Sequence, residues 1–447
     1  MGESTQTTQK GLLRAIRRWD LVAVVINIVI GAGIFGLPSA VYALIGPYSL
    51  IAFAVCALVV ALIALCFAEV GSRFSETGGP YLYAREAFGS VAGFEVGWLI
   101  WLARLTSFAA NCNLLIDYLG YFHRGIGAGW PRAIVIIAVV VALATVNVMG
   151  VRNAALFSDV FSIGKLIPLV LFIGVGLFFL EPGNFSAAAQ PAISSFSKSL
   201  LLLIYAFTGF EMAIIPAGEM RDPQRNVPFA ILISLIVVAV VYILVQVVCV
   251  GTLPELAVSK RPLADASERF LGAIGAIVIT AGVVISIIGN LIVGILAAAR
   301  VLFAMAEAGE LPSVLAATHA RFRTPHLAII ATAAVMLALT LSGKFISSLT
   351  VSVIARLVAY IATCAALIVL RRRDEREMRF KAQFKTPAGA VVSVGGLGLS
   401  AWLLAQISGG EARNTAVAAA AGLLIYVVYK LGRRNSDVEK VLESTRT

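Results

Sequence analysis

The chain alternates long apolar stretches with short polar segments over almost its whole length. Each apolar stretch holds about 20 residues, the length that an α-helix needs to cross the hydrocarbon core of a bilayer. The pattern predicts an all-α membrane protein, with cytoplasmic tails at residues 1–19 and 432–447. The twelve predicted membrane spans lie at approximately residues 20–45, 48–70, 91–121, 132–150, 157–180, 198–218, 228–251, 271–303, 327–343, 346–370, 388–408 and 414–431.

The composition excludes a water-soluble protein. Of the 447 residues, 60% are hydrophobic and 13% are charged, and the mean hydropathy is +0.94. Soluble domains average roughly 45–50% apolar and about 25% charged residues, and a globule of this size could not bury the excess. The first 19 residues have no apolar core before a cleavage site, so we expect no removable signal peptide.

The net charge of +11 fits a membrane topology. With the N-terminus in the cytoplasm, lysine and arginine favour the cytoplasmic side by roughly three to one, and seven of them lie in residues 371–385. Both termini are therefore predicted to be cytoplasmic, with the chain in the cell (inner) membrane. The basic residues are not interleaved with aromatic residues, so no nucleic-acid partner is expected.

The sequence offers neither metal ligands nor a catalytic motif. The five cysteines lie inside apolar stretches without a CxxC pair, and the three histidines lie in loops. The spans contain no HExxH or GxSxG motif, which argues against an intramembrane hydrolase. No polar ring recurs as a channel filter requires. We therefore expect no cofactor, no metal and no enzymatic activity, and a carrier rather than a channel.

Two predicted spans are interrupted in their middle. The first contains GAGIFG at residues 31–36, and the sixth contains TGFE at residues 208–211, followed by Pro216 and Gly218. Broken backbone at membrane depth is tolerated only where it faces protein or a wet cavity. Interruptions at equivalent positions of two five-helix halves indicate the central site of a transporter.

The GAGIFG run has three interpretations. It matches the G-x-G-x-x-G fingerprint of dinucleotide sites, but it lies inside one apolar span and residues 37–68 contain no Asp or Glu. A second interpretation is close helix packing through small residues. We favour a third, an unwound segment whose N–H groups bind a carboxylate at the start of the following half-helix. Unpaired carbonyls upstream would then bind an ammonium group, so that the site suits a zwitterionic amino acid.

Several stretches resemble the amino acid–polyamine–organocation (APC) transporters, in the family's order and at its spacing. The run VIGAGIFGLP at residues 29–38 resembles the signature of the first helix. The run RLTS at 104–107 resembles the R-P-T-S run of the third helix, with Leu105 in place of the usual proline. Other matching stretches are FAE at 67–69, ETGGPY at 76–81, EMRDPQRNVP at 219–228 and RVLFAMA at 300–306.

The resemblance implies a LeuT-type fold with alternating access and no covalent chemistry. Residues 20–180 and 198–370 would form two inverted repeats of five helices, followed by two extra helices in residues 388–431, and helices one and six would be discontinuous. The substrate would lie between those two helices, with Tyr205 as an aromatic gate and Thr208 lining the side-chain pocket. The substrate-binding residues so assigned are Ile30, Gly31, Ala32, Gly33, Ile34, Tyr205, Phe207, Thr208, Gly209 and Phe210, with Asn111 and Asn290 as polar neighbours.

Charged residues inside the spans form a second group of candidates. The resemblance places Lys165 where sodium-coupled relatives of the fold bind their ion, so Lys165 is expected to replace sodium or to carry a coupling proton, with Ser286 nearby. The alternative for Lys165 is snorkelling to the cytoplasmic side. Glu211 is expected to stabilise the broken sixth helix or to respond to protonation. Arg104 and Arg356 are expected to pair with carboxylates or carbonyls rather than to contact substrate.

The predicted function is sodium-independent secondary transport of amino acids, by proton-coupled symport or by exchange. Thr208 and Tyr205 suggest a neutral substrate, whereas Glu211 leaves room for a cationic amino acid or polyamine carried by an antiporter. A channel is the third alternative. The expected partners are the small-molecule substrate, protons and the lipid bilayer, and the sequence leaves a homo-oligomer open.

Overall fold

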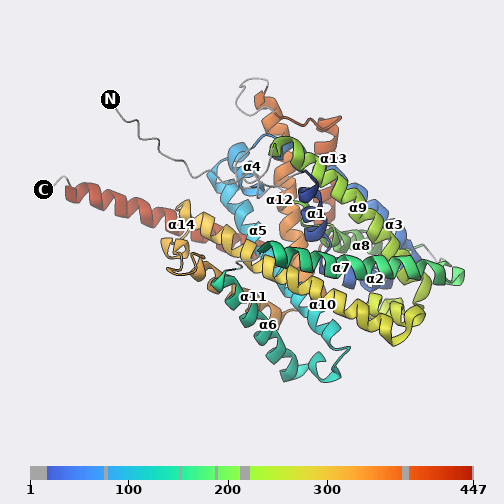
Figure 1. Cartoon of the computed structure of the whole chain (residues 1–447). Coiled ribbons are helices and arrows are strands. Elements are labelled where there is room, and N and C mark those ends of the chain that lie inside the picture. The colour runs from blue at the N-terminus through green and yellow to red at the C-terminus, as the bar shows by residue number, and fades with distance from the viewer. Residues whose placement is uncertain are drawn as a thin grey trace, which may run out of the picture.

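The computed structural model describes residues 18–74, 79–150, 154–186, 190–211, 222–374 and 382–444, and these residues contain helices and no strand (Figure 1). Short 3-10 turns connect several of the helices. The predicted end of the sixth span, with Pro216 and Gly218, lies outside the described residues. The helices are α1 (Arg18–Val29), α2 (Ala32–Ile45), α3 (Ser49–Gly71), α4 (Pro80–Phe88), α5 (Ser90–Leu119), α6 (Gly129–Met149), α7 (Ala154–Gly176), α8 (Ile193–Ala206), α9 (Pro223–Thr252), α10 (Pro262–Glu307), α11 (His326–Ser342), α12 (Phe345–Asp374), α13 (Gly389–Leu404) and α14 (Gly409–Ser444).

The predicted spans coincide with helices of the structure. Each falls on one helix, except that the first is divided into α1 and α2, and the sixth falls on α8 only as far as Ala206. Within the described residues, seven helical segments are long and apolar enough to cross a membrane, and four shorter apolar helices accompany them. The predicted tail after residue 431 continues α14 as far as Ser444. The described part of the chain is thus an all-helical, multi-pass membrane protein.

The helices pack around α5, which lies at the centre of the bundle. α5 contacts α4, α10, α11 and α12, and most of its side chains are buried. Helices α7 and α10 pack together, as do α6 and α11, which lie at one edge of the molecule, while α14 projects beyond the bundle (Figure 1). The outer helices expose large apolar side chains such as Ile134 on α6 and Val417 on α14, as a lipid-facing surface requires.

Two local features differ from the predicted pattern. The eighth span was expected to begin at residue 271, but α10 begins at Pro262 and is kinked at Gly272, where φ is +64°. Glycine adopts this left-handed backbone conformation at little cost. The kink at Gly272 connects the helical residues 262–271 to the long apolar part of α10. The polar segment after the second span contains the short helix α4, which packs against α5 and α12.

Candidate substrate site

The first interruption lies between α1 and α2. α1 ends at Val29, and Gly31 has extended backbone angles (φ −118°, ψ −156°) as the residue before α2. No side chain caps this helix start. Because the first four N–H groups of an α-helix have no partner inside the helix, the start of α2 presents hydrogen-bond donors and the positive end of the helix dipole.

The second interruption follows α8, which ends at Ala206. The backbone N–H groups of Phe207 and Thr208 still bond to Ile204 and Tyr205, and the chain then turns at Gly209, where φ is +114°. Residues 210–211 form a 3-10 turn, beyond which the described residues stop until 222.

The two interruptions touch each other. A Cβ added at Gly33, in the first turn of α2, would lie 2.7 Å from Cα of Ala206 at the end of α8. A Cβ added at Gly209 would lie 3.0 Å from the Ile28 side chain. The glycines that interrupt the predicted spans therefore allow the two helix ends to approach at backbone distance.

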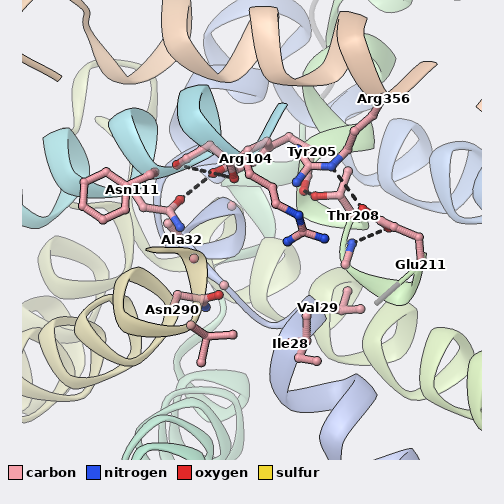
Figure 2. A pocket seen from close by; sticks show the side chains of 17 residues that line it. Ile28, Val29, Ala32, Arg104, Asn111, Tyr205, Thr208, Glu211, Asn290 and Arg356 are labelled. Atoms are coloured by element: carbon pink, nitrogen blue, oxygen red, sulfur yellow. Dashed lines mark hydrogen bonds and ion pairs between the residues drawn. The ribbon is translucent and has the colours of Figure 1, made fainter. Parts of the chain in front are cut away.

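A cavity of about 80 Å³ lies beside these helix ends (Figure 2). One water needs about 10–15 Å³ on this measure, so the cavity has room for a small solute. Residues of α1, α2, α5, α8, α10 and α12 enclose it, together with the turn after α8. The lining residues are Ile28, Val29, Gly31, Ala32, Gly33, Arg104, Ser107, Phe108, Asn111, Tyr205, Thr208, Gly209, Glu211, Asn290, Val293, Gly294 and Arg356.

Asn290 of α10 supplies a hydrogen-bond donor beside the start of α2. Its amide nitrogen Nδ2 would lie 3.0 Å from a Cβ added at Gly31. Nδ2 is buried and has no hydrogen-bond partner among the described residues. A buried donor without a partner costs about 1–3 kcal/mol, so this position favours a solute that brings an acceptor atom.

The Tyr205 side chain connects α8 to α5. Its hydroxyl donates to Oδ1 of Asn111 at 2.5 Å and lies 3.1 Å from Oγ of Ser107. Asn113, the neighbouring asparagine on α5, instead donates to the carbonyls of Ala109 and Thr340, outside the cavity. Asn111 is thus the asparagine of α5 that faces the cavity.

Glu211 is held by donors from several elements. Its Oε1 accepts from Nε of Arg356 at 3.1 Å, and its Oε2 accepts from the N–H of Gly209 at 2.8 Å and the hydroxyl of Tyr360 at 3.2 Å. The Glu211 side chain is 3% exposed. Glu211 therefore fixes the turn after α8 to α12, and its carboxylate oxygens are already engaged. Arg356 pairs with a carboxylate, as expected, and also lines the cavity.

Arg104 of α5 lines the cavity, although the sequence predicted that it pairs with carboxylates or carbonyls rather than contacts substrate. Figure 2 shows its guanidinium group in the middle of the lined space, between Asn290 on one side and Glu211 on the other. The helical spacing in the sequence could have placed Arg104 in the cavity wall. Residues 104, 107, 108 and 111 share one face of an α-helix, and Asn111 on that face was already predicted to lie near the substrate.

Lys165 of α7 lies outside the cavity, against the end of α1. Its ammonium group donates to the carbonyl of Ile30 at 3.0 Å and to that of Asn27. Lys165 is 4% exposed, so its side chain does not snorkel to a solvated surface. Cations stabilise helix C-termini, whose last carbonyls have no partner inside the helix. Ser286, expected nearby, has a buried hydroxyl with no hydrogen-bond partner in the described part of the chain.

The structure brings most of the predicted substrate residues together, but not all of them. Ile30, Ile34, Phe207 and Phe210 do not line the cavity. The predicted substrate residues that do line it are Gly31, Ala32, Gly33, Asn111, Tyr205, Thr208, Gly209 and Asn290, and Glu211, predicted to stabilise the sixth helix or to respond to protonation, lines it as well.

A central polar cavity beside two helix ends, in a multi-pass helical bundle, defines a transporter of small solutes. The family model described as "Amino acid permease" matches residues 16–428, so the chain belongs to the amino acid permease family, within the APC superfamily. The resemblance seen in the sequence is confirmed.

Three relatives illustrate the range of the family. The chain is 28% identical to a methylthioribose transporter of Bacillus subtilis, over 98% of this chain and 97% of the relative. It is 29% identical to a serine/threonine exchanger of B. subtilis, over 83% and 87% of the two chains. It is 32% identical to an arginine/ornithine antiporter of Pseudomonas aeruginosa, over 70% and 67%. These relatives are transporters, and the chain is a transporter rather than an enzyme.

Proposed function

We propose that the cavity binds one amino acid between the ends of α1 and α8 and that the protein carries it across the membrane by alternating access. The α-carboxylate would bind at the start of α2, with the Asn290 amide as an additional donor. The observation that supports this most directly is the unpartnered Nδ2 of Asn290 beside Gly31. An anionic group at a helix N-terminus is favoured by the free N–H groups and by the helix dipole.

The ammonium group of the substrate is assigned to the backbone carbonyls of Thr208 and Gly209, the two residues of the turn after α8 that line the cavity together with Glu211. The upstream carbonyls of the first interruption have protein donors already: Lys165 binds those of Asn27 and Ile30, and the Tyr242 hydroxyl lies 2.9 Å from that of Val29. We therefore assign the carboxylate to the first interruption and the ammonium to the second.

We further propose the membrane arrangement that the sequence predicts. Residues 20–180 and 198–370 form two inverted repeats of five spans, and two more spans follow in residues 388–431. Both termini lie in the cytoplasm, and the protein resides in the inner membrane. In support, the two interruptions occur in the first span of each repeat and meet at one cavity.

Lys165 is proposed to make transport independent of sodium. Its ammonium group supplies a fixed positive charge to the α1 carbonyls, the kind of ligand that a bound sodium ion would use. Loss of the Lys165 proton would weaken this attachment, which gives a route to proton-coupled symport. Exchange is the alternative mode, and the relatives named as an exchanger and an antiporter favour it.

The experiment is counterflow in proteoliposomes that contain the purified protein. Liposomes loaded with an unlabelled amino acid should accumulate the same amino acid in radiolabelled form, with sodium replaced by choline and no pH gradient. A carrier gives a transient overshoot, whereas a channel only equilibrates the label. Absence of an overshoot with every one of the twenty amino acids would contradict the proposal.

A variant of Asn290 tests the assigned site. Asn290→Ala removes a donor to the carboxylate and should weaken apparent affinity about tenfold, since hydrogen bonds to charged groups contribute about 1.5–3 kcal/mol. Asn184→Ala is the matched control, because that side chain bonds to the Gly251 carbonyl away from the cavity. An unchanged affinity in Asn290→Ala would refute the site.

A further inference from the structure

Two of the five cysteines lie side by side in the helical bundle. Cys66 of α3 and Cys364 of α12 are far apart in the sequence, yet their thiols are within hydrogen-bonding reach of each other. A Cβ added at Gly396 of α13 would lie 3.1 Å from Sγ of Cys364 and 3.9 Å from Sγ of Cys66. The missing side chain on α13 therefore leaves room for both sulfur atoms, and both thiols are free and buried.

The two thiols are not explained by the cavity or by packing. Neither cysteine lines the cavity, and Cys56, also on α3, donates instead to the carbonyl of Leu200. A free cysteine packs as a small apolar side chain, so packing alone does not require two of them in contact. Paired thiols add one property that apolar side chains lack, which is reversible oxidation to a disulfide.

The two cysteines lie next to aromatic contacts that reach the cavity. Phe67, which follows Cys66, packs on the ring of Tyr360 with the centroids 5.4 Å apart. Tyr360 lies one turn before Cys364 on α12, and its hydroxyl donates to Glu211 in the cavity wall. A shift of α3 against α12 therefore changes the contacts that hold the turn after α8.

We propose that Cys66 and Cys364 form a modification site, at which a peroxide produces a disulfide that fixes α3 to α12 and arrests transport. In the first step the peroxide oxidises one thiol to a sulfenic acid and releases one water. In the second step the other thiol attacks the sulfenic sulfur, the S–S bond forms and a second water leaves. The O–O bond of the peroxide takes up the two electrons that the sulfurs lose, and both thiol protons end in water.

The covalent bond restricts a motion that the free thiols permit. A disulfide fixes the separation and the dihedral angle of its two sulfurs, whereas two thiols in contact can slide past each other. Packed helices in switching proteins shift by about 1–2 Å, and the bond would block such a shift between α3 and α12. The arrest of transport rests on the proposed function, which requires alternating access, but formation of the disulfide does not.

A small oxidant can reach this site from one end of the bundle. The side chain of Arg371, two turns after Cys364 on α12, is 32% exposed. Under the proposed topology this end faces the cytoplasm, where a reducing environment keeps thiols free. The site would therefore stay open in a reducing cytoplasm and would close when peroxide accumulates.

The test counts thiols in the purified full-length protein before and after treatment with hydrogen peroxide. The protein is denatured, alkylated with N-ethylmaleimide and weighed by mass spectrometry, and peptide mapping identifies the linked residues. We expect all five cysteines to be alkylated before oxidation and two fewer after it, with both recovered by dithiothreitol. Counterflow in proteoliposomes treated in the same way should fall to background and return on reduction.

Alanine variants separate the two cysteines from the others. Cys66→Ala and Cys364→Ala should each form no disulfide and keep counterflow after peroxide. Cys249→Ala, which removes a buried cysteine of α9, should respond like the wild type. The wild-type thiol count and peptide map decide the case even where a variant does not fold.

Four results would overturn the inference: an unchanged thiol count, a disulfide between other cysteines, full counterflow after the two thiols are oxidised, or a loss of thiols that dithiothreitol does not reverse. The last would indicate sulfinic acid rather than a disulfide. Absence of counterflow in the reduced protein would overturn the proposed function, and the thiol count would still decide whether the disulfide forms.

Discussion

At the scale of single residues, one hydroxyl group connects the two helix ends that border the cavity. The Tyr242 hydroxyl, from α9, lies 2.9 Å from the Val29 carbonyl and 3.0 Å from the Ala206 carbonyl. Tyr242 is fully buried. Because both carbonyls belong to the last turns of interrupted helices, they lack the partners that a continuous helix would provide. Tyr242 thus supports a backbone arrangement that is costly in a membrane interior.

Removal of this hydroxyl should destabilise the protein. Tyr242→Phe is expected to lower the unfolding free energy by about 1–3 kcal/mol, because it leaves buried carbonyls without a donor. Thermal unfolding in detergent measures the effect. Tyr83→Phe is the matched control: Tyr83 is also fully buried, but its hydroxyl has no hydrogen-bond partner in the described residues. Equal melting temperatures for the two variants would contradict this account.

The Lys165 ammonium gives a second prediction at this scale. In Lys165→Ala we expect uptake driven by a pH gradient to be lost, while counterflow without a gradient persists. The reason is that the proposed coupling proton is removed but the cavity residues are untouched. Lys198→Ala, on the exposed side of α8, should behave like the wild type. Unchanged gradient-driven uptake in Lys165→Ala would exclude Lys165 as the coupling site.

At the scale of helices, the close contact between α2 and α8 depends on a missing side chain. A Cβ at Gly33 would lie 2.7 Å from Cα of Ala206 and 3.2 Å from its Cβ, so the two helices would have to separate. The closest of these atoms belongs to the backbone, and backbone cannot rotate away as a flexible side chain can. The arrangement of the cavity wall therefore follows from glycine at this position.

Gly33→Ala should separate the two helix ends. Overpacking of a tight contact costs about 1–3 kcal/mol, and we expect a lower melting temperature together with loss of transport. Gly174→Ala on α7 adds the same methyl group where no atom lies within 4 Å, and it should leave both properties unchanged. A fully active Gly33→Ala protein would show that the contact is not needed.

The helices themselves were predictable from the sequence, because a span of about 20 apolar residues is a strong signal. α4 was missed because its nine residues are too few for a membrane span and it is held by packing on α5 and α12. The kink at Gly272 was missed because a glycine in an apolar run does not reveal its backbone angles.

The candidate site was predictable only in part. The glycine-rich interruptions carry a local signal, since glycine at membrane depth is informative. The central place of Arg104 depends on how α5 is rotated against α10 and α12, which is a tertiary property. The side-chain partners of Glu211 come from α12, about 145 residues along the chain, so no spacing rule indicates them.

At the scale of the whole molecule, Glu69 joins three distant parts of the chain. Its carboxylate accepts from Arg371 of α12 at 2.7 and 2.5 Å, from the Thr386 N–H before α13 at 2.8 Å, and from Arg73 at 3.2 Å. The Glu69 side chain is 1% exposed. The cluster therefore connects α3, α12 and the approach to α13 at one end of the bundle.

Loss of the Glu69 charge should weaken these connections together. Glu69→Gln is expected to cost about 1.5–3 kcal/mol, because Arg371 loses the charged partner of its two hydrogen bonds, while Arg73 keeps its ion pair with Asp374. Glu255→Gln is the control, since its ion pair with Arg269 is exposed and such pairs contribute only about 0–1 kcal/mol. Chemical denaturation in mild detergent compares the two. A cost for Glu69→Gln no larger than for Glu255→Gln would show that this cluster is not a structural clamp.

The attachment of Lys165 to α1 has a mechanical consequence. A diffusible ion can leave such a position when its concentration falls, but an ammonium group on a covalent tether cannot dissociate into the medium. Any motion that draws α1 away from α7 must break the contacts with Asn27 and Ile30 or carry α7 along with it. Under the proposed sodium-independent function, the separation of α1 from α7 is therefore controlled by the Lys165 contacts and not by the external sodium concentration.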